Sequence, residues 1–111
     1  MSMMRHSANW QNIWDDRILE IAEEDDDGIV TVGDLAGHEL IRTSRSTVSR
    51  RCSKLADNGL LRRVSEGVYV ITDEGRGYID EKYDVERGMW LENESIPNGT
   101  EGADIEEANG A

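Results

Sequence analysis

The sequence predicts one α+β domain, mainly helical, in which a basic helix is followed directly by a β-hairpin. Apolar residues recur at three- and four-residue spacing within 10–22 and again within 48–56, as they do in amphipathic helices. Two β-prone segments within 60–71 are joined by three residues that end in glycine, which is typical of a tight hairpin. The length of 111 residues suits a single domain with a modest core.

The first helix is expected to begin near Trp10 and to end in an acidic run at 23–27, before Gly28. Five consecutive acids at a helix C-terminus oppose the helix macrodipole, so this end should fray. The run lacks the alternating ligand spacing of a calcium loop, so we expect no metal site there. Asp15 and Asp16 lie in the first turn, where acids are favoured, and a structural role suffices for them. The predicted apolar face consists of Trp10, Ile13, Trp14, Ile18, Ile21 and Ala22.

A short second helix is predicted after the β-prone pair Ile29-Val30. Thr31 and Asp34 have the spacing of a capping box in which Asp replaces Glu. The helix should bury Val32, Leu35 and Ala36 and end near Gly37.

The central element is a helix over residues 44–58, with Ser44 as its N-cap and Gly59 in the left-handed position that ends it. Its two faces differ. The core face carries Val48, Cys52, Leu55 and Ala56, and the opposite face carries Ser46, Thr47, Arg50, Ser53, Lys54 and Asp57. Cys52 is the only cysteine, so no intramolecular disulfide can form, and its place on the apolar face indicates a small core residue.

Positive charge is concentrated on this helix and on the start of the hairpin. Residues 40–63 hold seven of the twelve basic side chains and one acid, which gives this window a charge of +6 in a chain of net charge -12. Such a patch favours a polyanion as partner. Hydroxyl side chains in the first turn let the backbone approach phosphates, and Arg can read a guanine edge, so the helix fits a DNA major groove.

The order helix, short helix, turn, basic helix and hairpin is that of a winged helix-turn-helix, in which a short β-hairpin is the wing. We expect a mobile N-terminal arm at 1–9, the winged-helix domain at 10–91 and a disordered acidic tail at 92–111. The wing should span 61–71, and a last helix should begin after Thr72.

The last helix is predicted to carry an apolar stripe of Tyr78, Ile79 and Tyr83, followed by the cluster Met89-Trp90-Leu91. Exposed aromatic residues of this kind could form the surface of a two-fold dimer through the first and last helices. The alternative is that the stripe packs against the protein's own first helix. The sequence leaves both open.

Composition also bears on the environment of the protein. The excess of 24 acids over 12 bases, with only two lysines, resembles the proteins of halophilic archaea that accumulate salt. No run of about eighteen apolar residues and no secretory signal is present, so we expect a cytoplasmic protein with no membrane partner. His6 and His38 are isolated, and no catalytic, cofactor-binding or metal motif is found, so no enzyme is expected.

The segments 50–55, 59–61 and 68–76 together resemble the winged-helix proteins of halophilic archaea related to the phage phi-H repressor, and more distantly the MarR/PadR-like regulators. In these a strand ends in Thr and enters a helix through an acid and Gly, as at 72–75. The resemblance covers about 10–83 and implies a transcriptional regulator, usually dimeric, that binds double-stranded DNA and is expected to act as a repressor. By position, the DNA-binding role then falls on Arg45, Ser46, Thr47, Ser49, Arg50, Arg51, Ser53, Lys54, Arg62 and Arg63.

Within this set, Arg45, Arg51, Arg62 and Arg63 are expected to contact phosphates, and Ser46, Thr47, Arg50 and Lys54 to enter the groove. The competing hypothesis is a winged helix that binds a protein partner and no DNA. The basic face favours DNA, because a protein-binding winged helix has no need of hydroxyl and Arg side chains opposite its core.

Overall fold

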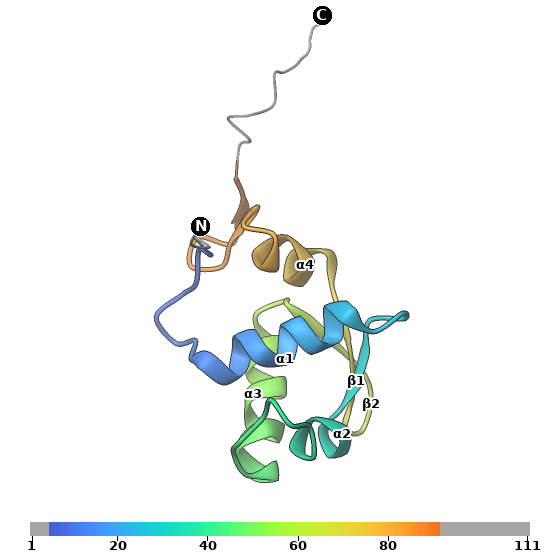
Figure 1. Ribbon diagram of the computed structural model, residues 1–111. Helices are drawn as coiled ribbons and strands as arrows, with labels where there is room; N and C mark the ends of the chain where they lie inside the picture. Colours follow the sequence, from blue (N-terminus) through green and yellow to red (C-terminus); the bar gives the residue numbers. More distant parts are fainter. Residues whose placement is uncertain (1–4, 92–111) are drawn as a thin grey trace, which may run out of the picture.

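A computed structural model describes residues 5–91, in which the helices pack against a three-stranded antiparallel sheet at one side (Figure 1), and a second, two-stranded sheet follows the last helix. Residues 92–111, where we predict a disordered tail, lie outside the described residues, as do residues 1–4. In chain order the elements are α1 (Ile13–Glu24), β1 (Ile29–Thr31), α2 (Val32–Ala36), α3 (Arg45–Asp57), β2 (Leu61–Ser65), β3 (Val68–Ile71), α4 (Asp73–Ile79), β4 (Tyr83–Asp84) and β5 (Met89–Trp90).

Helix α1 begins three residues later than its apolar pattern predicts. Asn12 is the N-cap, because its side chain accepts from the backbone N–H of Asp15 while the Asp15 carboxylate accepts from the backbone N–H of Asn12. Trp10 therefore lies before the helix, in a turn closed by the hydrogen bond from the backbone N–H of Gln11 to the carbonyl of Ala8, and packs on the core. The helix ends at Glu24, as predicted, and Gly28 turns the chain with a φ of +72°.

The core lies between α1, α3, α4 and the sheet. Helix α1 contributes Ile18, Leu19 and Ala22, and α3 contributes the predicted Val48, Cys52 and Leu55, all of them without exposed surface. Helix α2 is capped by Thr31, whose hydroxyl accepts from the backbone N–H of Asp34, and buries Val32 and Leu35. The predicted order of helix, short helix, turn and basic helix is confirmed, and α3 with its two caps spans the predicted 44–58, whereas α1 begins later than predicted.

The wing belongs to a three-stranded antiparallel sheet of order β1-β3-β2. Leu61 pairs with Ile71 and Arg63 with Tyr69, which places these side chains on the inner face, whereas the neighbouring Arg62 pairs with Val70 on the outer face. The hairpin turns at Glu66-Gly67, where Gly67 has a φ of +73°.

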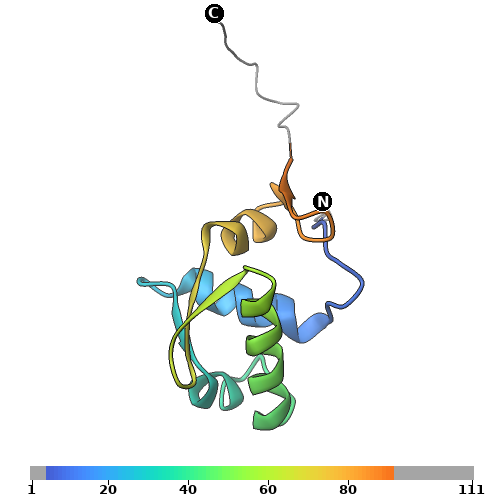
Figure 2. The same ribbon diagram turned by 180° about the vertical axis from the view of Figure 1, so that it is seen from behind.

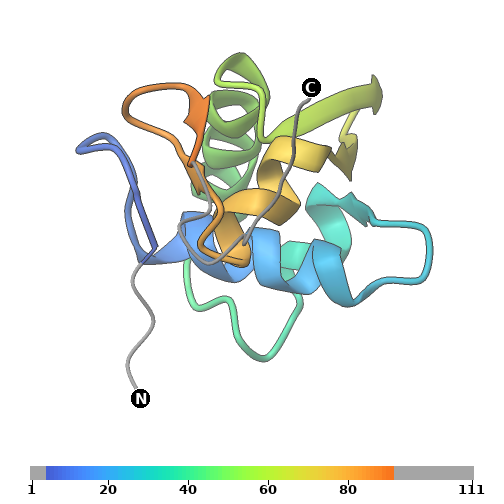
Figure 3. The same ribbon diagram turned by 90° about the horizontal axis from the view of Figure 1, so that it is seen from above.

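The residues predicted as an exposed stripe on the last helix are buried. Tyr78, Ile79 and Tyr83 are 1, 5 and 9% exposed, and Tyr83 lies beyond α4 in β4. Helix α4 packs on α1 (Figure 3), and the Tyr78 hydroxyl donates to Asp16 on α1 at 2.6 Å. These three side chains therefore belong to the core, and Tyr78 contacts the first helix as the second alternative predicts. Met89 and Trp90 in β5 remain half exposed.

The described part of the expected N-terminal arm is attached to the domain. Arg5 forms ion pairs with Asp16 and Glu20 on α1, and the backbone carbonyl of His6 accepts from Val85 at 2.9 Å. Ala8 is buried. A domain boundary at residue 10 would cut through this packed segment, because its charged and backbone groups are satisfied by α1 and by the residues after β4.

Candidate nucleic-acid interface

Helix α3 lies beside the wing (Figure 2), and its exposed residues are all polar or charged. Ser44 caps the helix by accepting from the backbone N–H of Thr47, and the packing of Val48 and Cys52 turns the opposite side outward. We define the recognition face as six of its exposed side chains: Arg45, Ser46, Ser49, Arg50, Ser53 and Lys54; Asp57, at the end of the helix, is also exposed. Thr47 lies at its border and is partly buried.

The Arg50 guanidinium is held against its own helix. Nη1 donates to the Ser46 hydroxyl at 2.9 Å, and Nη2 donates to the Thr47 hydroxyl at 3.2 Å. Thr47 accepts in turn from the Ser44 hydroxyl at 3.1 Å. The hydroxyl residues of the first turn thus orient the guanidinium before any partner arrives.

A hollow of about 390 Å³ lies between the first half of α3 and the wing. Arg45, Ser46 and Ser49 line it from the helix, and Arg63 and Glu66 line it from the hairpin. We call this hollow the wing cleft. Two guanidinium groups facing one cleft make it suitable for a phosphate, and the single acid at the wing tip opposes that charge.

The side chains of Arg62 and Arg63 lie on opposite faces of the wing. Both are exposed, but strand pairing sends Arg63 toward the wing cleft with Tyr69, and Arg62 to the outer face with Val70. We predict from the sequence that both contact phosphates. The structure brings only Arg63 together with Arg45, because successive side chains of a strand point to opposite faces.

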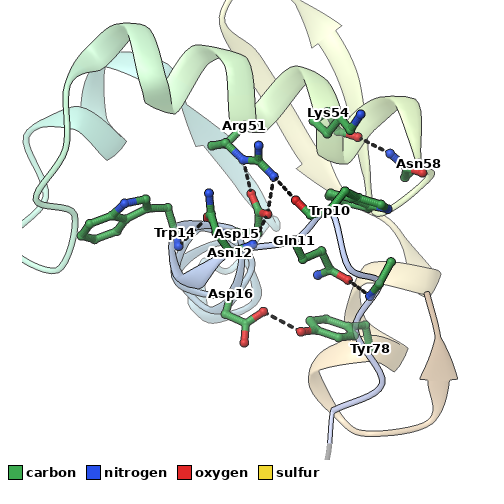
Figure 4. A network of polar contacts seen from close by, with 11 residues as sticks. Trp10, Gln11, Asn12, Trp14, Asp15, Asp16, Arg51, Lys54, Asn58 and Tyr78 are labelled. Carbon is green, nitrogen blue, oxygen red and sulfur yellow. Dashed lines mark hydrogen bonds and ion pairs between the residues drawn. The ribbon is translucent and has the colours of Figure 1, made fainter. Parts of the chain in front are cut away.

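Arg51 is directed away from the recognition face. Its Nε and Nη2 donate to the two carboxylate oxygens of Asp15 at 2.8 and 2.7 Å, and Nη2 also donates to the Trp10 carbonyl at 2.9 Å (Figure 4). The hydrogen bond to Asp15 raises the pKa of Arg51 above its ordinary value. The prediction that Arg51 contacts phosphates conflicts with this position, because the guanidinium already has a carboxylate partner inside the domain.

Trp10, which the sequence predicts only as part of an apolar face, also belongs to this region. The Lys54 ammonium lies 5.9 Å from the centre of its ring and the Arg51 guanidinium 6.0 Å. These are cation–π distances, so the Trp10 ring contacts the basic side chains in the second half of α3. No spacing rule links residues so far apart in sequence.

Other chemistry is not indicated in the part of the chain that the structure describes. Within residues 5–91 no group of three His, Cys, Asp or Glu side chains could hold a metal ion. Cys52 is buried, and burial raises the pKa of its thiol to about 12. No helix among the described residues is long and apolar enough to cross a membrane.

Comparisons with known proteins agree on the type of domain. A family model described as winged helix-turn-helix phage repressor matches residues 4–93. The crystal structure of the PhiH1 repressor-like protein from Haloarcula marismortui is similar with a TM-score of 0.76 and 44% sequence identity, over 81% of this chain and 100% of that chain. The comparison with curated proteins gave no match.

Proposed function

Because this chain belongs to the winged helix-turn-helix phage repressor family, we propose that it is a sequence-specific transcriptional regulator that binds double-stranded DNA and represses. The family is one of repressors and not of enzymes. The observation that carries the proposal is the continuity of the recognition face with the wing cleft, where Arg45 from α3 and Arg63 from β2 line one hollow.

In the proposed complex α3 enters the major groove. Arg50 exchanges its hydrogen bonds to Ser46 and Thr47 for a base edge, with guanine as the preferred partner because its O6 and N7 accept from one guanidinium. Ser46 and Ser49 are short enough to let the helix approach the DNA, and Lys54 extends the contact. Arg45 and Arg63 hold a phosphate in the wing cleft and fix the register.

Because the net charge of the protein is -12, DNA binding requires that salt screens the repulsion between the protein and DNA. At about 0.1 M salt the Debye length is roughly 10 Å and at 1 M roughly 3 Å, so long-range repulsion between the acidic protein and DNA fades in molar KCl. Contacts between Arg side chains and phosphates are weakened less. A salt-accumulating cytoplasm is therefore the environment that we propose for this function.

We further propose a homodimer that places two recognition helices on a pseudo-palindrome. Met89 and Trp90 are exposed and available for the dimer surface, whereas Tyr78, Ile79 and Tyr83 are buried in the core. Light scattering in molar KCl, with and without DNA, tests this. A monomer in both conditions contradicts it.

The proposal is tested by selecting duplexes from a random pool on the purified protein in molar KCl and measuring affinities by fluorescence anisotropy. Arg50→Ala should weaken a selected site by about 1–3 kcal/mol and a random duplex by less. Arg62→Ala is the control, because its side chain lies on the outer face of the sheet. If no duplex is enriched at any KCl concentration, the protein-binding winged helix becomes the better hypothesis.

A further inference from the structure

The contact between α1 and α3 contains one buried ion pair. Asp15 is fully buried, and its carboxylate accepts two hydrogen bonds from Arg51 and one from the backbone N–H of Asn12 at 2.8 Å. The same carboxylate therefore closes the capping box of α1 and binds α3. Figure 4 shows the two side chains meeting between the helices, with the Trp10 carbonyl as a further acceptor for Arg51.

This pair is the contact of α3 with α1 whose geometry is fixed by hydrogen bonds. Among the hydrogen bonds within residues 5–91, those from Arg51 to Asp15 are the ones that join α3 to α1, whereas Arg50 and Asn58 bond within or beside their own helix. The apolar contacts of α3 with the core come from the buried Val48, Cys52 and Leu55 and from the partly buried Ala56. Apolar packing is not directional, so it permits small rotations that a bidentate Arg–carboxylate pair does not.

Rotation of α3 matters for its outer surface. Arg50 and Arg51 are adjacent, about 100° apart around the helix, so fixing the direction of one also fixes the other. Trp10 adds to this, because its ring lies beside both Arg51 and Lys54. The segment that carries Trp10 is itself attached to Ile79 and Val85 through Arg5 and His6.

We propose that Asp15 and Arg51 are positioning residues for DNA recognition: they set the rotation of α3 about its axis and touch no DNA themselves. The inference rests on the proposed DNA binding. It predicts that loss of the pair lowers the discrimination between a specific and a random duplex, because Arg50 is then misdirected, while the number of phosphate contacts is unchanged.

The test uses the double variant Asp15→Asn with Arg51→Met, which removes both charges together, since a lone Asp15 would be left buried and unpaired. Arg62→Met is the control for the loss of one Arg outside the proposed interface; it makes the net charge more negative by one, whereas the double variant leaves the net charge unchanged. Affinities for a selected site and for a random duplex are measured across KCl concentrations, after circular dichroism has confirmed the helical content.

The double variant should lose roughly ten- to a hundredfold in affinity for the selected site, as when one base contact is misplaced, and little on random DNA. Its slope of log K against log salt should match that of the parent. A slope lower by about 0.9 on both duplexes, with unchanged discrimination, would mean that Arg51 contacts a phosphate and would overturn the proposal. Unchanged discrimination with an unchanged slope overturns it equally.

Arg51→Lys provides the second variant if the double variant unfolds. Lysine keeps the charge but not the two-pronged geometry, so discrimination should fall between the parent and the double variant. If the parent protein binds no duplex, the proposed function fails on its own. Residual dipolar couplings of α1 and α3 amides in parent and Arg51→Lys then decide the positioning role: an unchanged interhelical orientation refutes it.

Discussion

The two adjacent arginines of β2 should differ sharply in their effect on DNA binding. Arg63 faces the wing cleft with Arg45, and Arg62 faces outward with Val70. Both are exposed and both are single positive charges in the same strand. Arg63→Ala and Arg62→Ala therefore remove the same charge from opposite faces of one sheet, so any difference between them reports geometry and not net charge.

The magnitude follows from counterion release. One phosphate contact contributes about 0.9 to the slope of log K against log salt, so over a tenfold change in KCl the affinity ratio of parent to Arg63→Ala should change about eightfold. The ratio should be largest at low salt. It should be the same for a selected site and a random duplex, because phosphates carry no sequence information. Arg62→Ala should keep the slope of the parent.

Anisotropy titrations of one labelled duplex from 0.1 to 1 M KCl provide the measurement. The reasoning is refuted if both variants lower the slope equally, which would mean that the long-range field of the patch matters and the wing cleft does not. It is also refuted if Arg63→Ala changes discrimination between sequences, which would make Arg63 a base contact.

Four further outcomes are expected. Residues 92–111 hold six acids and no base, so deleting them should raise DNA affinity at low salt and change it little in molar KCl; equal titration curves at low salt would remove the tail from the mechanism. Gly75→Ala should destabilise the fold by about 1–3 kcal/mol in thermal unfolding, because the added methyl group would overlap the Leu60 carbonyl. Gly59→Ala is the contrasting variant, because a methyl group there meets no other atom and any loss of stability comes from the backbone φ of +81°. Cys52 should resist alkylation at pH 8 until denaturant is added. Since its thiol pKa rises from 9.0 to about 12 on folding, the folded state retains a proton that the unfolded state loses, and the free energy of unfolding should fall as pH rises from 9 to about 12.

The sequence by itself determined the features that depend on neighbours along the chain. Ser44, Thr31 and Thr72 cap their helices through hydrogen bonds that span only three residues, so the hydroxyl and its position suffice to find them. The apolar face of α3 and the positive charge opposite it follow from helical periodicity and composition. For Arg62 and Arg63 the sequence predicted the same phosphate role, and the pairing of β2 with β3 places them on opposite faces of the wing.

Only the tertiary structure decided which partner each long side chain takes. Arg51 carries the same charge as Arg50 and lies next to it, yet it binds Asp15, which is 36 residues away in sequence. From the sequence, the stripe of Tyr78, Ile79 and Tyr83 fits a dimer interface and a core equally well. In the structure α4 packs on α1 and the three side chains are buried. The physical reason is that local hydrogen bonds and periodicity determine where an element lies in the sequence and which residues share a face. Burial and ion pairing depend on which other element packs against that face.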